Sequence, residues 1–226
     1  MASFDTKMIA MTNTTEQHAG PAFEGPRAIF ASAMGTAAAA IDRVVPEQFG
    51  APTPCSELDV RDLISHLLAV AARVSAVGRG LDAMSTPDMV AAANDDWSGA
   101  WKRAIGDYAE AWRDDSTLEQ IVVLPWATLP GSEFLAMYAS EVAVHTWDLA
   151  MATNQSPKWD ASVIETSMAS MVQHLPAEGR VEAFEAFRAT MSVVPADWNA
   201  PYANAVAVAD DAKPIDRLVA WTGRTP

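Results

Sequence analysis

The stretch GSEFLAMYASEVAVHTWDLAMAT, residues 131–153, decides the fold, because its apolar residues follow the 3.6-residue period of a helix. Two polar residues, Glu141 and His145, fall within this apolar face or at its edge, where a solvated helix would not place them. A carboxylate and an imidazole that are buried together need a partner. The stretch therefore predicts a core helix that carries a polar site. Its apolar stripe is Phe134, Leu135, Tyr138, Val142, Leu149 and Ala152.

A divalent metal ion is the simplest partner for a Glu and a His one turn apart on one helical face. A tight site needs a third ligand, and the chain has three other histidines. His18 lies in an N-terminal region without periodicity, and His174 lies near the end of a later predicted helix. His66 lies at the margin of the apolar stripe of a predicted helix over residues 56–78. We therefore predict a metal site formed by His66, Glu141 and His145.

Two nitrogens and one carboxylate leave metal positions open for water or a substrate, which is typical of catalytic zinc sites. Nickel, iron and manganese accept the same ligands. An exposed Glu-His pair and a hydrogen-bonded core histidine are the alternatives that the spacing leaves open. Asp148 follows His145 by three residues, and either orients that ligand or pairs with an arginine such as Arg61.

The remaining pattern predicts an all-α fold. Helices are expected over residues 26–45, 56–78, 87–112 and 161–175, with shorter ones over 182–191 and 214–221. Ser56 and Asp59 resemble a capping box. Residues 118–130 predict an extended crossover, either a short strand or half a hairpin. Four principal helices with a long crossover before the last indicate a four-helix bundle. Residues 1–25 are expected to form a disordered extension, and residues 26–226 a single domain.

The composition limits the kinds of partner that we expect the protein to bind. The net charge is −14 with only 15 Lys and Arg, so we expect neither a nucleic acid nor an anionic membrane as partner. A membrane span needs about 20 apolar residues, and no stretch reaches that length. The single cysteine, Cys55, suits a reducing, cytoplasmic location. It stands just before the predicted helix at 56–78, and is either a nucleophile activated by the helix dipole or a small buried residue.

Two segments together resemble a known family. PTPCSELDVRDLISHL, residues 52–67, and EVAVHTWDLA, residues 141–150, are similar to the DinB-like superfamily. The closer resemblance is to actinobacterial metal-binding proteins related to the N-terminal domain of mycothiol-dependent maleylpyruvate isomerase. The tail DDAKPIDRLVAWTGR, residues 210–224, also resembles the ending of that subgroup.

The resemblance implies an up-down-down-up four-helix bundle, often dimeric, with zinc or nickel held by His66, Glu141 and His145. It also implies a low-molecular-weight thiol such as mycothiol, which the metal binds and activates for attack on a small electrophile. Leu58 stands where the family commonly has Trp, which we interpret as a packing change. No counterpart of the isomerase's second domain is expected, and with it any substrate contacts from that domain are missing. We therefore expect a metal- and thiol-dependent S-transferase or isomerase. The alternatives are a metal-dependent binding or sensor protein and a purely structural metal.

Overall fold

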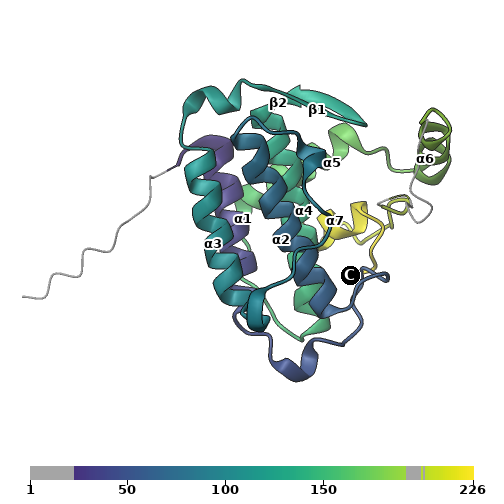
Figure 1. The fold of residues 1–226 in the computed structure, drawn as a ribbon. Helices are drawn as coiled ribbons and strands as arrows, with labels where there is room; N and C mark the ends of the chain where they lie inside the picture. The colour runs from purple at the N-terminus through teal and green to yellow at the C-terminus, as the bar shows by residue number, and fades with distance from the viewer. Residues whose placement is uncertain (1–22, 192–199, 201) are drawn as a thin grey trace, which may run out of the picture.

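The computed structural model describes residues 23–191, 200 and 202–226, and within them the chain is mostly helical (Figure 1). A two-stranded antiparallel hairpin pairs Ile121 with Pro130 and Leu124 with Ala127. The predicted helical character is confirmed, and the extended crossover proves to be a complete hairpin. The helices are α1 (Gly25–Ile41), α2 (Val60–Gly78), α3 (Trp97–Ala111), α4 (Gly131–Ala152), α5 (Ala161–His174), α6 (Arg180–Arg188) and α7 (Pro214–Trp221); the strands are β1 (Ile121–Leu124) and β2 (Ala127–Pro130).

Helices α1 and α2 each lie against both α3 and α4 (Figure 1). Helices α2 and α3 run in the same direction. Arg61, at the start of α2, pairs with Asp95 just before the start of α3. Near the other ends of the two helices, the Trp112 indole just after α3 donates to the Val74 carbonyl of α2 at 2.8 Å. Parallel neighbours need a long connection, and residues 79–96 provide it. Helix α4 packs on α2 in the opposite direction and completes the set of four packed helices.

Helix α3 begins ten residues later than the sequence pattern predicted, at Trp97 rather than at Pro87. Asn94 and Asp95 both have a φ of 56°, a left-handed conformation that a continuous helix excludes. The carboxylate of Asp96 then accepts a hydrogen bond from the Gly99 amide and caps the helix. Val90 and Ala92 pack against the core, but neither belongs to a helix.

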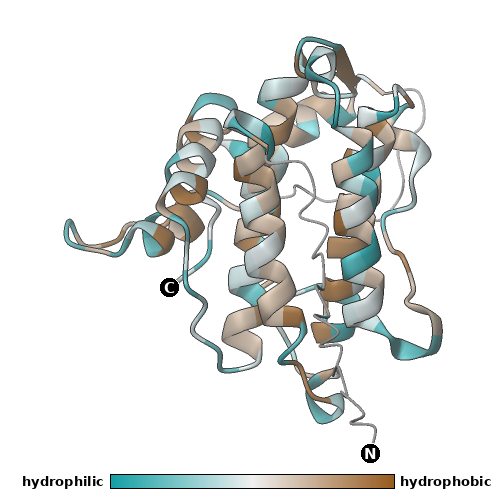
Figure 2. Ribbon diagram, turned by 90° about the vertical axis from the view of Figure 1, so that its left-hand side faces the viewer, coloured by the Kyte–Doolittle hydropathy of each residue, from teal (hydrophilic) through white to brown (hydrophobic). Residues whose placement is uncertain are grey.

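The core lies between the four helices. Trp97, Trp101 and Trp112 are buried there, and the Trp101 indole donates to the Met34 carbonyl at 3.0 Å. The right-hand helix in Figure 2 shows the division of faces, with hydrophobic residues along the edge toward its neighbour and hydrophilic residues along the other edge. The core thus places apolar packing on both sides of any polar group carried by α2 or α4.

The C-terminal half of the chain returns to the bundle. Helix α5 packs on α1 and α4, and α7 packs on α5 and α4. Figure 1 shows α6 set apart from the bundle, whereas α7 lies beside the bundle. No helix within the described residues is long and apolar enough to cross a membrane. Of the predicted N-terminal extension, only residues 23–25 belong to the described part of the chain. The prediction of disorder for residues 1–22, and His18 within them, lies outside the described residues.

Helix α2 begins at Val60, and its cap differs from the predicted capping box at Ser56. Asp59 is itself the N-cap, and its carboxylate accepts the Asp62 amide at 2.9 Å. Because α2 carries His66, this cap fixes the start of a helix that a metal site would use.

We expect Asp59→Ala to lower the free energy of unfolding by about 1 kcal/mol, since an N-terminal amide of α2 loses its acceptor. Asp59→Asn keeps an acceptor at the same place and should unfold within about 0.5 kcal/mol of the wild type. Urea unfolding of both variants measures the difference. Equal loss in the two variants would show that the charge, and not the cap, matters.

Candidate metal centre

The three predicted ligands come together between α2 and α4. The His66 Nε2 atom lies 3.3 Å from the Glu141 Oε1 atom, and the rings of His66 and His145 meet nearly at right angles with centroids 5.0 Å apart. One ligand atom from each of the three residues lies within 4.8 Å of the others. The antiparallel packing of α2 against α4 produces this arrangement. The Glu141 and His145 pair on α4, which the spacing predicted, is thus joined by His66 from α2.

The charges of the group complement one another. Burial opposes the charged form of His66, but the hydrogen bond and charge of Glu141 outweigh it and raise the His66 pKa. Burial likewise opposes the Glu141 carboxylate, and His66 together with the charges around it lowers the Glu141 pKa. Burial lowers the pKa of His145 and favours the neutral ring, which is the form that binds metals. The Glu141 carboxylate thus favours a positive charge beside it, either on His66 or on a bound cation.

Each imidazole is oriented through its other nitrogen. The Nδ1 atom of His66 lies 3.2 Å from the backbone carbonyl of Asp88, and the Nδ1 atom of His145 lies 3.1 Å from the Asp148 Oδ2 atom. Such partners fix the ring and its tautomer, so the Nε2 atom is the one left for a metal. Both histidines thus have the support that metal-binding histidines require.

Asp148 has two partners, and neither is Arg61. Besides His145 it accepts a bidentate pair of hydrogen bonds from Arg224, with both distances at 2.7 Å. The Asp148 side chain is 0% exposed and that of Arg224 is 9% exposed. Arg61 pairs with Asp95 instead and lies 4.8 Å from the centre of the Phe49 ring. The prediction of an arginine partner was right in type and wrong in position.

Cys55 lies near this group without being an activated thiol. Its sulfur forms a second group with His145 and Asp148, within 4.8 Å. Burial is the largest influence on its pKa and raises it, although the charge of Arg224 acts in the opposite direction. Helix α2 begins only at Val60, so its dipole does not act directly on Cys55. The structure favours the small, partly buried cysteine over the nucleophile.

Several residues of this neighbourhood were not predicted. Arg224 and Tyr202 come from the C-terminal segment, and the Arg224 guanidinium lies 5.8 Å from the centre of the Tyr202 ring. Asp88 and Arg73 lie on the opposite side of His66. None of these residues belongs to a periodic pattern that points to the site. His174, at the end of α5, is exposed and takes no part.

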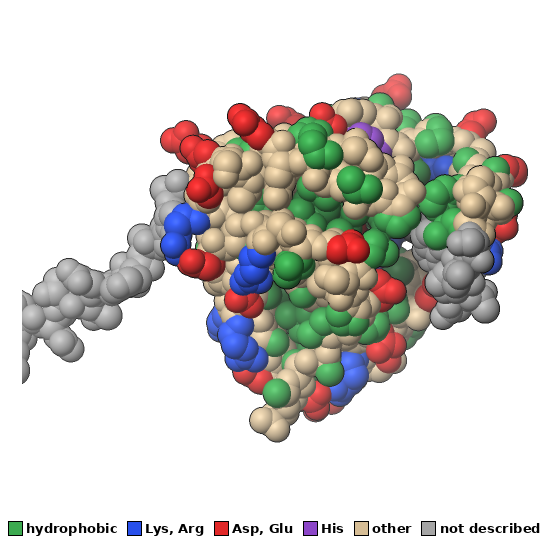
Figure 3. Space-filling model, turned by 45° about the horizontal axis from the view of Figure 1, so that its top comes forward, with side chains coloured by type: hydrophobic (Ala, Val, Ile, Leu, Met, Phe, Trp, Pro, Cys, Tyr) green, Lys and Arg blue, Asp and Glu red, His purple; other side chains and the backbone are tan. Residues whose placement is uncertain are grey.

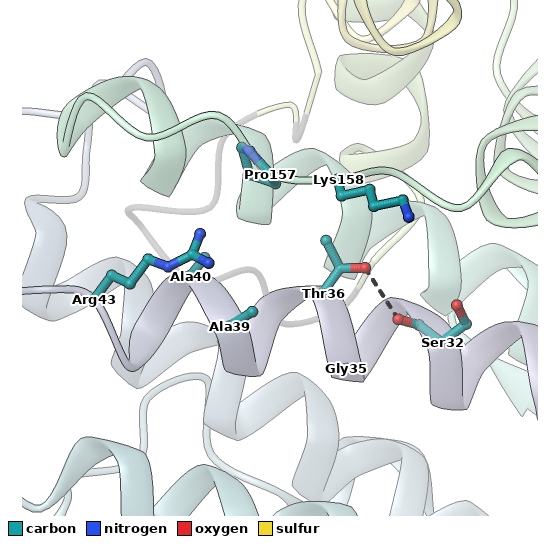
Figure 4. A pocket seen from close by; sticks show the side chains of 8 residues that line it. All are labelled: Ser32, Gly35, Thr36, Ala39, Ala40, Arg43, Pro157 and Lys158. Atoms are coloured by element: carbon teal, nitrogen blue, oxygen red, sulfur yellow. Dashed lines mark hydrogen bonds between the residues drawn. The ribbon is translucent and has the colours of Figure 1, made fainter.

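Two surface depressions lie away from the three ligands. One, drawn in Figure 4, opens between α1 and the connection after α4, and the other lies between α5, α7 and the segment before α7. On the face in Figure 3, acidic side chains lie around the margin, and Lys and Arg form no continuous patch. The first depression is lined by Ser32, Gly35, Thr36, Ala39, Ala40, Arg43, Pro157 and Lys158.

Comparison with known proteins places this arrangement in a family. Residues 30–150, which include α2 and α4 with all three ligands, match the mycothiol maleylpyruvate isomerase N-terminal domain family. The chain belongs to this family. Two uncharacterized proteins of Mycobacterium tuberculosis, from strains CDC 1551 / Oshkosh and ATCC 25618 / H37Rv, are each 28% identical over 189 residues, which is 83% of this chain and 91% of theirs.

A solved structure agrees on the fold of this family member. The crystal structure of the mycothiol-dependent maleylpyruvate isomerase superposes with a TM-score of 0.54 over 70% of each chain, at 16% sequence identity. At that identity the likeness concerns the fold alone. The match of residues 30–150 to the family confirms the resemblance inferred from the two sequence segments.

Proposed function

We propose that the protein is a divalent-metal-dependent enzyme that uses a low-molecular-weight thiol of the mycothiol type, as an S-transferase or isomerase acting on a small electrophile. The observation that carries the proposal is the convergence of His66, Glu141 and His145 within 4.8 Å, in a member of a family named for a mycothiol-dependent isomerase. We also propose the DinB-like class for the bundle. Arg27, near the start of α1, donates to the Trp112 carbonyl just after α3 at 3.1 Å, so α1 runs opposite to α3 and the order of α1–α4 agrees with up-down-down-up.

The donor set fits a catalytic zinc. Two imidazoles and one carboxylate leave room for exchangeable ligands, and the group is only partly covered, since His66 and Glu141 are half-buried. A zinc ion bound there would lower the pKa of a coordinated thiol, so that a thiolate exists at neutral pH. Nickel would serve the same purpose.

The chain's own residues hold and orient these ligands. Asp148 holds the Nδ1 proton of His145, and the carbonyl of Asp88 accepts the Nδ1 proton of His66. Glu141 contributes the negative charge that neutralises part of the cation. No separate general base is assigned among the described residues. Thiol activation by the metal makes such a base unnecessary.

Turnover tests the proposal directly. Zinc-loaded protein is incubated with mycothiol and a panel of electrophiles that includes maleylpyruvate, an epoxide and an alkyl halide, and loss of free thiol and formation of product are followed by mass spectrometry. We expect product formation that falls to background in Glu141→Ala. In an S-transfer the thiol ends in the product and is consumed, whereas in an isomerisation it is released again and its concentration stays constant. Metal and thiol binding without conversion of any electrophile would instead support a non-catalytic binding or sensor protein. A homodimer stays a prediction that sedimentation analysis checks.

A further inference from the structure

The connection between α2 and α3 includes a short strap, residues 86–90, that lies along α2. The Val90 amide donates to the Ser65 carbonyl at 3.2 Å, and the Ser65 hydroxyl donates to the Val90 carbonyl at 3.1 Å. Between these contacts and the start of the strap, the Asp88 carbonyl lies 3.2 Å from the His66 Nδ1 atom. The strap therefore provides the acceptor that orients the metal-binding candidate of α2.

That acceptor is a backbone atom in a segment without helix or strand. A neutral His66 that presents Nε2 to a metal carries its proton on Nδ1, and the proton needs a fixed acceptor. A helix or sheet fixes its carbonyls through regular hydrogen bonds, but the strap has none of these. Another contact has to hold the peptide of Asp88 in place.

Arg73 makes that contact. It stands seven residues after His66, so it lies on the same face of α2, about 10 Å further along the axis. Its Nη2 atom donates to the Asp88 Oδ1 atom at 2.7 Å, and its Nε atom donates to the Thr86 hydroxyl at 3.3 Å. The guanidinium also interacts with Tyr138, which lies one turn before Glu141 on α4. One side chain thus connects the strap to both ligand-bearing helices.

The burial of the two partners is unequal. The Arg73 side chain is 8% exposed, whereas that of Asp88 is 85% exposed. An exposed carboxylate on a loop has no fixed position of its own, and surface pairs of that kind contribute little to stability. Here a buried and immobile guanidinium fixes the carboxylate, and with it the peptide that faces His66.

We propose that Arg73 is a positioning residue for the metal centre, which holds Asp88 so that its backbone carbonyl orients the His66 ring. The inference rests on the proposed metal site and adds a residue outside the ligand group. Arg73 is not a member of the candidate ligand group, and the proposal has it act through Asp88. A purely structural pairing, which only attaches the connection to the bundle, is the competing explanation.

Zinc affinity separates the two explanations. We compare wild type, Arg73→Met, Arg73→Lys and Asp88→Ala by competition with a zinc chelator. Loss of the support of a ligand lowers metal affinity by about 10-fold to 100-fold, and we expect that loss in Arg73→Met and Asp88→Ala, with partial rescue in Arg73→Lys. The matched control is Arg79→Met, which breaks the Arg79–Asp107 pair at the end of the same helix and should leave zinc affinity unchanged.

A spectroscopic measurement reports the orientation itself. In zinc-loaded wild type and Arg79→Met, the Nδ1 proton of His66 should give a protected NMR signal, which Arg73→Met loses to exchange. Unchanged zinc affinity and an unchanged signal in folded Arg73→Met and Asp88→Ala would overturn the inference. If Arg73→Met does not fold, Asp88→Ala alone decides, because its change lies on the surface.

The same design distinguishes failure of the metal site from failure of the inference. If the wild type binds no zinc, the proposed function fails. The inference is then tested in metal-free protein at alkaline pH, where ¹⁵N NMR should find the His66 proton on Nδ1 in wild type and a mixture of tautomers in Arg73→Met. The same tautomer in both proteins would overturn it.

Discussion

Zinc should be absent from the Glu141→Ala and His66→Ala proteins, whereas the wild type should carry close to one ion per chain. Either change leaves two ligands, and two nitrogen or oxygen donors hold zinc far more weakly than three. The loss of affinity should exceed the roughly 10-fold to 100-fold that removal of a supporting group causes. Mass spectrometry of metals on tag-free protein, after exposure to zinc and removal of the excess, measures the content.

Two controls accompany this measurement. His174→Ala removes an exposed histidine of α5 and should keep the wild-type content. Glu141→Gln keeps the size of the side chain and removes its charge, so it should lose most of the metal without disturbing α4. Zinc retained in all of these proteins would place the metal elsewhere, and no zinc in any of them, even after reconstitution, would refute the site. Circular dichroism establishes that the variants are folded.

Asp148→Ala should destabilise the protein by about 3–5 kcal/mol, because it leaves the Arg224 guanidinium buried without its counter-charge. It also removes the acceptor of the His145 Nδ1 proton. Urea unfolding of metal-free protein measures the loss separately from any metal effect. The exposed pair of Arg79 and Asp107 gives the comparison, since Asp107→Ala should cost less than about 1 kcal/mol.

A double variant tests the reason for that loss. If the unpaired charge of Arg224 is the cause, Asp148→Ala combined with Arg224→Ala should be less destabilised than the sum of the two single changes. Additive losses would show that the two side chains stabilise the protein independently. A cost below about 1 kcal/mol for Asp148→Ala would contradict the buried ion pair altogether.

Local sequence patterns predicted the helices well where periodicity and a clear boundary coincide. Helix α4 was predicted over 131–153 and α7 over 214–221, and both lie there. Proline at its first position fixes the start of α7. The start of α3 was missed because Val90 and its neighbours are apolar for another reason: they line the strap against α2. Apolar content alone does not distinguish these two uses.

The part of the candidate site that lies on one helical face could be predicted from the sequence. Glu141 and His145 stood out because a charged pair in an apolar stripe requires a partner, and His66 was the remaining histidine with similar surroundings. Arg224 was missed as the partner of Asp148 because 76 residues separate them, and no spacing rule connects such residues. The contact of His66 with Asp88 was missed because a backbone carbonyl has no signature in the side-chain sequence.

The bond between Asp148 and Arg224 also has a consequence for the order in which the protein forms. During synthesis α2 and α4 leave the ribosome long before residue 224, so the three ligands can meet while His145 still lacks its full support. Closing a loop of 76 residues is the step that fixes Asp148, and it costs chain entropy that the contacts of the C-terminal segment offset. We therefore expect the candidate centre to stay loosely ordered until Arg224 has been synthesised and has paired with Asp148.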